Sequence, residues 1–295
     1  MPDRSVRIPA SALFSATARV FGALGLPDAA AAAVAEGSVD GDMRGIPSHG
    51  LMLVPMYAER IGAGSVTTAT KGEVVTDLGT IAVLDAKNAL GILTGDQAMG
   101  LAIERAREFG ISAVAVRHAF HFGGAFRYVM AAAEAGLVGI AAANTRPLMP
   151  APGGAATVVG NNPLAIGVPR GSAASPDGTG STAEIGASDG AGPIVLDMAL
   201  LEAALGKIRI AAAEGREIPP TWATDSSGGP TTDPEAAIAS LLPTNRSAAT
   251  YHGFDQILRI ENDLQGACYA WCRRRHDLPP TAEAPPRFPF RGGDF

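Results

Sequence analysis

Short apolar runs alternate with longer helix-like segments between residues 72 and 215. Residues 72–91 alternate apolar and polar side chains between Gly and Asn, a pattern typical of a hairpin or strand pair. Strands that alternate with helices along a chain predict a sheet domain of the α/β or α+β class. The sequence predicts buried strands at 111–119 and 137–145, further strands at 162–169 and 192–200, and helices at 95–110, 125–136 and 200–215.

A helical part precedes this sheet domain. Residues 8–36 and 49–64 carry apolar side chains at helical spacing, and residues 252–275 predict a last helix that packs back on them. We therefore expect two domains: a helical domain formed by 1–72 together with 245–295, and an α/β domain at 73–244.

Residues 170–192 consist largely of Gly, Ser and Ala and offer almost nothing to bury, which predicts a mobile loop. The nearest match to G-x-G-x-x-G, Gly178-x-Gly180-x-x-Ala183, lies in this loop and not between a strand and a helix. The sequence also lacks a P-loop motif. A standard Rossmann domain is therefore not supported.

Composition narrows the possible partners. The net charge is −6 and basic residues form no run, which argues against nucleic acid and anionic membrane surfaces. Apolar residues make up 47% of the chain, but they form no uninterrupted stretch long enough for a membrane span, and the start resembles no secretory signal. The chain has two cysteines, which do not make a disulfide framework, so we expect a reduced, cytoplasmic protein. Cys268, Cys272 and His276 are either a metal site or ordinary helix residues, and we expect no metal because a fourth ligand is not evident.

The stretch "GDMRGIPSHGLMLVPMY", residues 41–57, contains the first candidate site. Ser48-His49 is either a proton-transfer pair or a polar turn between two helices. Asp42 and Arg44 are candidates for an ion pair or cap that sets the turn.

Polar residues after the predicted strands form further candidates. In "VRHAFHFGGAFRY", His118 and His121 precede two glycines and a helix, which indicates either an anion site at a helix N-terminus or a tight turn with a buried His. The polar, Gly/Pro-rich segment 144–169 is either a site-building return between strands or a set of turns. Asp197 at a strand end could orient a His or cap the next helix.

Taken in order, these motifs resemble the type-2 malate/L-lactate dehydrogenase family. The resemblance covers roughly residues 7–267 and rests on "DMRGIPSHGL", "HFGG", "PGG", "GNNPLAIGVP", "PIVLDMA" and "LLP…HG". It implies a non-Rossmann, L-sulfolactate dehydrogenase-like fold and a homodimer. It also implies NADH or NADPH as cofactor, and hydride transfer at C2 of a 2-hydroxy acid, a 2-oxo acid or a cyclic imino acid.

The same resemblance assigns roles to residues. His49 matches the family's proton donor or acceptor, and Ser48 matches the residue that assists it. Asp197 is a further catalytic candidate, and Arg127, Arg146 and Asn144 are candidates for substrate binding. The matches to the cofactor-lining positions are His121, Phe122, Gly123, Gly124, Asn162, Met198, His252 and Gly253.

Three positions or segments depart from the family pattern. Leu53 stands where relatives usually carry the Arg that grips the substrate carboxylate, so either Arg127 or Arg146 supplies the guanidinium or carboxylate recognition is lost. His252 replaces the usual Lys of a "KG" motif near the cofactor. The 170–192 loop is longer than the family connection, and the Pro-rich tail indicates a divergent, C-terminally shortened member.

Two hypotheses follow from the resemblance and these departures. The first is an NAD(P)H-dependent reductase or dehydrogenase that uses Ser48 and His49. The second is a repurposed family member without a cofactor, in which His49, His121 and Asp197 carry out acid–base chemistry such as isomerisation, cyclisation or a lyase step. An inactive binding protein is a third and weaker possibility.

Overall fold

The computed structural model describes residues 7–150, 156–170, 192–199, 201–203 and 205–240. Its contacts separate a unit at Met1–Asn245 from a second unit at Arg246–Phe295, and only the first contains described residues. The predicted loop at 170–192 therefore lies almost entirely outside the described residues. The predicted last helix and the predicted membership of 245–295 in the helical domain lie outside them completely.

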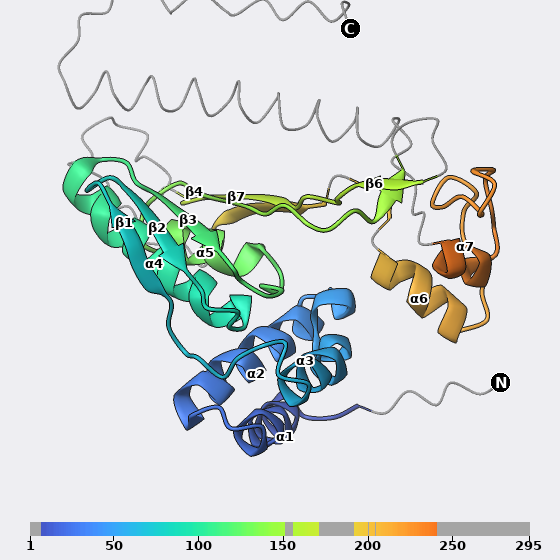
Figure 1. Ribbon diagram of the computed structural model, residues 1–295, viewed down its shortest axis with the longest axis horizontal. Helices are drawn as coiled ribbons and strands as arrows, with labels where there is room; N and C mark the ends of the chain where they lie inside the picture. The colour runs from blue at the N-terminus through green and yellow to red at the C-terminus, as the bar shows by residue number, and fades with distance from the viewer. Residues whose placement is uncertain (1–6, 151–155, 171–191, 200, 204, 241–295) are drawn as a thin grey trace, which may run out of the picture. The chain divides into compact units, whose positions relative to one another are not determined.

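The N-terminal part is a layer of three α-helices, with two short 3₁₀ turns before the last one (Figure 1). The predicted third helix begins later than expected, at Val54 in place of residue 49, because Gly50 (φ −101°, ψ −146°) interrupts the helical backbone. The elements are α1 (Ala10–Ala23), α2 (Asp28–Met43), η1 (Pro47–His49), η2 (Leu51–Leu53) and α3 (Val54–Gly62).

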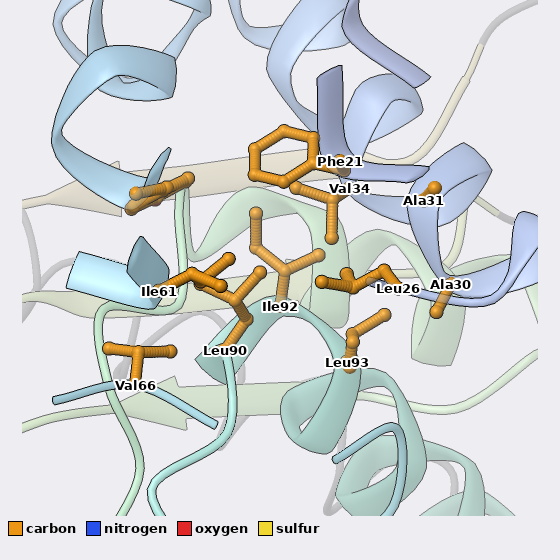
Figure 2. Close-up of a cluster of buried hydrophobic side chains, with 11 residues drawn as sticks. Phe21, Leu26, Ala30, Ala31, Val34, Ile61, Val66, Leu90, Ile92 and Leu93 are labelled. Atoms are coloured by element: carbon orange, nitrogen blue, oxygen red, sulfur yellow. The ribbon is translucent and has the colours of Figure 1, made fainter. Parts of the chain in front are cut away.

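One apolar core joins this layer to the first helix of the sheet domain, α4 (Gly91–Phe109). Figure 2 shows Phe21, Val34, Ile61 and Ile92 gathered around one space, and all four are buried. Burying each such side chain contributes roughly 1.5–3 kcal/mol. The helical layer is thus held to α4 by packing that involves all of α1, α2 and α3.

The first sheet has the order β1-β2-β3 and continues directly from this core. β1 (Glu73–Asp77) and β2 (Ile81–Asp85) form the predicted hairpin, and β2 pairs in parallel with β3 (Ala113–Arg117) after the α4 crossover. The expected burial of β3 is wrong for the described residues, since four of its five residues are exposed. β3 is the edge strand of this sheet, so one of its sides lacks a neighbouring strand there.

The second sheet consists of three antiparallel strands: β4 (Gly139–Ala142), β7 (Leu164–Val168) and β8 (Ile194–Met198). The expected burial of β4 is wrong for the described residues, since only one of its four residues is buried. Helix α5 (Phe126–Glu134) packs closely on one face because Gly139 and Gly167 have no side chain. A Cβ at Gly167 would clash with the Val129 carbonyl oxygen of α5.

Smaller elements complete the described part. The segment predicted as an irregular return contains a two-stranded sheet, β5 (Met149–Pro150) and β6 (Thr157–Val159). The predicted helix at 200–215 is α6 (Leu205–Ala213), and α7 (Pro234–Ser240) packs against it. The predicted α+β class is confirmed. None of the described helices is long and apolar enough to cross a membrane.

Candidate active site

The structure brings together two histidines that lie far apart in the sequence. His49 ends η1, and His121 lies in the loop between β3 and α5. Their imidazole rings stack with centroids 5.8 Å apart and planes inclined by 25°. The resemblance gave both residues a place in one site, and the fold puts their rings in contact.

The turn that carries His49 is shaped by Asp42, in the last turn of α2. The Leu51 backbone N–H donates to Asp42 Oδ2 over 3.4 Å, and a Cβ at Gly50 would overlap the same carboxylate. Asp42 therefore caps the turn, as one of the two expectations held. The expected ion pair with Arg44 is wrong, because Arg44 pairs with Asp40 at 2.8 Å.

His49 sits between a hydroxyl and a negative charge. Its Nδ1 lies 3.1 Å from Ser48 Oγ, so the hydroxyl holds one edge of the ring. Burial lowers the pKa of His49, and the charge of Asp197 opposes this by favouring the protonated imidazole. Helix α6 packs closely against Ser48, since a Cβ at Gly206 would lie 2.5 Å from Ser48 Cβ.

His121 is held in a neutral state. Its Nδ1 lies 2.7 Å from Tyr57 Oη and accepts a hydrogen bond from the Gly123 N–H at 3.2 Å. Burial, and to a smaller extent charge repulsion from His49, lower the pKa of His121 to about 4. The stacked pair therefore combines one imidazole that stays neutral with one that has a carboxylate nearby.

Asp197 links the second sheet to this pair. It lies opposite Ala165 in the β7–β8 register, and its Oδ2 accepts a hydrogen bond from the Phe126 N–H at 2.8 Å. Asp197 thus satisfies the first backbone N–H of α5, a helix that precedes it in the chain. Its carboxylate therefore lies at the N-terminus of α5, the end of a helix that favours a negative charge.

The glycines of the "HFGG" turn serve this geometry. Gly123 has φ +74°, which favours glycine, and a Cβ at Gly124 would clash with the Phe126 ring. Phe122 stacks on Tyr128 with centroids 5.4 Å apart. The segment is therefore a tight turn, and His121 within it is partly buried.

Hydrogen bonds of Thr145 join the loop after β4 to the loop before β7. Thr145 Oγ1 donates to Asn161 Oδ1 over 2.7 Å, and the Thr145 N–H donates to Asn162 Oδ1 over 3.1 Å. These bonds hold the segment with Asn144 and Arg146 at the end of β4, and both residues are exposed. Within the described part of the chain, Arg146 has no ion pair.

Arg127, the other candidate for the missing guanidinium, is already engaged. Its Nε and Nη2 bind Asp96 at 2.8 and 2.9 Å, and Nη2 also lies 3.1 Å from Glu36. The hydrogen bonds to Asp96 raise the pKa of Arg127 further. Leu53 packs against the apolar core between the helical layer and α4.

Some predicted residues lie elsewhere. Met198 ends β8, half-buried and opposite Leu164, whereas His252 and Gly253 are outside the described residues. Sequence reasoning missed Tyr57, whose only signal was its place one helical turn beyond Leu53. Among residues with assigned positions, no three His, Cys, Asp or Glu side chains gather as a metal site.

Known proteins are similar to this chain in sequence and in fold. A family model described as malate/L-lactate dehydrogenase matches residues 8–261. The malate dehydrogenase of Pyrococcus abyssi is 36% identical over 243 residues, which cover 82% of this chain and 62% of the relative. The NAD⁺-dependent ureidoglycolate dehydrogenase of Escherichia coli O157:H7 is 35% identical over 237 residues, covering 80% of this chain and 61% of that relative.

A solved structure extends the comparison to the fold. The sulfolactate dehydrogenase of Methanocaldococcus jannaschii superposes with a TM-score of 0.65 at 32% identity, over 78% of this chain and 62% of that one. The predicted L-sulfolactate dehydrogenase-like, non-Rossmann fold is confirmed. The chain spans about three fifths of the length of these relatives. Sequence and fold agree that the chain belongs to the malate/L-lactate dehydrogenase family.

Proposed function

We propose that the chain is an NAD(P)H-dependent dehydrogenase or reductase acting on a 2-oxo acid, a 2-hydroxy acid or a cyclic imino acid. The observation that carries this proposal is the stacked His49–His121 pair beside Asp197. One neutral imidazole next to one that a carboxylate helps to protonate suits the movement of a single proton. Family membership supports the reaction class.

His49 is the proposed proton donor and acceptor. When bound, a nicotinamide would supply the hydride for reduction at C2 of the substrate, or accept it in oxidation. In reduction, His49 gives a proton to the C2 oxygen or nitrogen, and in oxidation it takes that proton back. Ser48 engages Nδ1 of the ring and so leaves Nε2 for the substrate, while Asp197 stabilises the imidazolium form.

Arg146 is the proposed holder of the substrate carboxylate, with Asn144 beside it. Both side chains are exposed at the strand end of the sheet that carries Asp197. A guanidinium without an ion pair among the described residues can bind a carboxylate bidentately. Arg127 is the weaker candidate because its guanidinium already pairs with Asp96 and Glu36.

Amide side chains of the Asn162 loop also fit a nicotinamide, since an amide can hydrogen-bond to its carboxamide. We propose that the "HFGG" turn, which precedes α5, lines the cofactor. The loop with Asn162, which precedes β7, lines it as well. Further proposed contacts are His121, Phe122, Gly123, Gly124 and Met198.

We further propose a homodimer that acts in the cytoplasm. Support for the dimer comes from the β4–β7–β8 sheet, whose face opposite α5 is apolar. Ile140 and Ile194 on that face are 64% and 62% exposed among the described residues. Exposed apolar patches of this kind mark association surfaces. Sedimentation of the purified chain tests the dimer directly.

The alternative remains cofactor-independent acid–base chemistry by His49, His121 and Asp197. One experiment separates the two: thermal unfolding of the purified chain with and without NADH or NADPH. A ligand at 100 times its dissociation constant stabilises a protein by about 2.7 kcal/mol. We expect a clear rise in Tm with one cofactor, and the absence of a shift with both would contradict the proposal.

Turnover assays then test the residues. Arg146→Ala should raise KM for 2-oxo acids without lowering Tm, whereas Arg216→Ala, which removes an exposed arginine paired with Glu214, should change neither. His49→Ala should abolish turnover in a folded protein. If Arg146→Ala leaves KM unchanged, another group binds the carboxylate.

A further inference from the structure

The Tyr57 hydroxyl is aimed at the site from within the core. The ring is 1% exposed and packs against Phe21 and Phe120, with centroids 6.4 and 6.0 Å away. These contacts fix the direction of the hydroxyl, which lies 2.7 Å from His121 Nδ1. Burial also raises the pKa of Tyr57, so the group remains a phenol with a proton to donate.

A second bond sets the direction of proton donation. The Gly123 backbone N–H lies 3.2 Å from the same Nδ1, and a backbone N–H can only donate. His121 Nδ1 must therefore be an acceptor, and the Tyr57 O–H donates to it as well. In neutral His121 the ring proton then lies on Nε2.

We propose that Tyr57 is a positioning residue that, with the Gly123 N–H, keeps the proton of His121 on Nε2. His121 then serves as a neutral hydrogen-bond donor toward the C2 oxygen or nitrogen of the substrate, while His49 transfers the proton. The role toward substrate rests on the proposed function, but the position of the proton does not.

The groups packed around His121 agree with this division. Tyr57 of α3 supplies a neutral hydroxyl, and His49 of η1 supplies the facing ring. Asp197 acts on His49, where it favours a positive charge. A second positive charge on the stacked His121 would be repelled by protonated His49. One imidazole of the pair is thus specialised for donation and the other for proton transfer.

Nitrogen NMR of the purified, ¹⁵N-labelled chain tests the position of the proton without turnover. His121→Asn identifies the His121 signals. We expect a bare Nδ1 and a protonated Nε2 in the native chain, and a mixture of both tautomers in Tyr57→Phe, which keeps the ring and removes only the hydroxyl. A protonated Nδ1 in the native chain, or an unchanged tautomer in Tyr57→Phe, would overturn the proposal.

Kinetics test the consequence for the reaction. Tyr57→Phe should lower kcat about tenfold, with KM changed less than about twofold, because donation by His121 is used mainly in the transition state. Ser38→Ala is the matched control: it removes a buried hydroxyl that donates to the Val34 carbonyl, away from the histidines, and should leave kcat unchanged. An unchanged kcat in Tyr57→Phe would overturn the catalytic role. A native chain without dehydrogenase activity would overturn the proposed function, and the NMR result would still decide the position of the proton.

Discussion

Removing the partly buried imidazole of His121 should make the free energy of unfolding less dependent on pH on the acid side. Burial and His49 lower its pKa from 6.5 to about 4. The unfolded chain therefore binds a proton near pH 6.5, whereas the native chain does so only near pH 4. The contribution of His121 to the free energy of unfolding is therefore fully present above pH 6.5 and is lost as the pH falls toward 4. A difference of about 2.5 pKa units corresponds to about 3 kcal/mol.

The assay is urea unfolding followed by circular dichroism, repeated between pH 4 and pH 8 for the native chain and His121→Asn. Asn keeps an acceptor near the Tyr57 hydroxyl but does not titrate. The difference in unfolding free energy between the two proteins should change by about 3 kcal/mol across this range. A constant offset reports lost packing and does not enter the test.

A matched control uses the same substitution at an exposed histidine. His118 has φ +52°, which Asn tolerates, and its side chain is 60% exposed beside Asp85. The His118→Asn protein should still lose unfolding free energy between pH 6.5 and pH 4, as the native chain does. If the curves of His121→Asn and the native chain run parallel, His121 is not a buried neutral group and the reasoning fails.

Other substitutions test the surrounding framework. Asp197→Asn should lower the pKa of His49 by removing a favourable charge, and the pH–kcat profile of reduction should move to lower pH; an unmoved profile would separate Asp197 from proton transfer. Arg127→Gln should cost about 2 kcal/mol in urea unfolding through its lost bonds to Asp96, with substrate KM unaffected; a selective rise in KM would make Arg127 the substrate anchor. Gly167→Ala should destabilise by about 1–3 kcal/mol because α5 leaves no room for a Cβ, and a near-native midpoint would show that α5 can shift.

Most of the described helices and strands could be predicted from the sequence, because their apolar spacing and their Gly and Pro boundaries are local signals. The start of α3 could not, since the interruption at Gly50 depends on the Asp42 carboxylate reaching across from α2. The exposure of β3 could not either, because the position of a strand within a sheet depends on its partners.

The candidate site shows the same division. Motif order pointed to Ser48, His49 and His121, and the fold brings them together. The sequence did not show that Tyr57 bonds to His121, because nothing in the spacing of two residues this far apart indicates a hydrogen bond. It likewise left open which arginine is free, since the partners of Arg127 lie on two other helices.

The most direct test of the proposed hydride transfer follows a deuterium atom. NADH or NADPH deuterated at the transferable position of the nicotinamide is incubated with the chain and a panel of 2-oxo acids and cyclic imino acids, and the products are examined by mass spectrometry. Hydride transfer predicts deuterium bonded to C2 of the product, with one cofactor oxidised per product and no reaction in His49→Ala. Substrate conversion without cofactor oxidation, or product without deuterium, would contradict it.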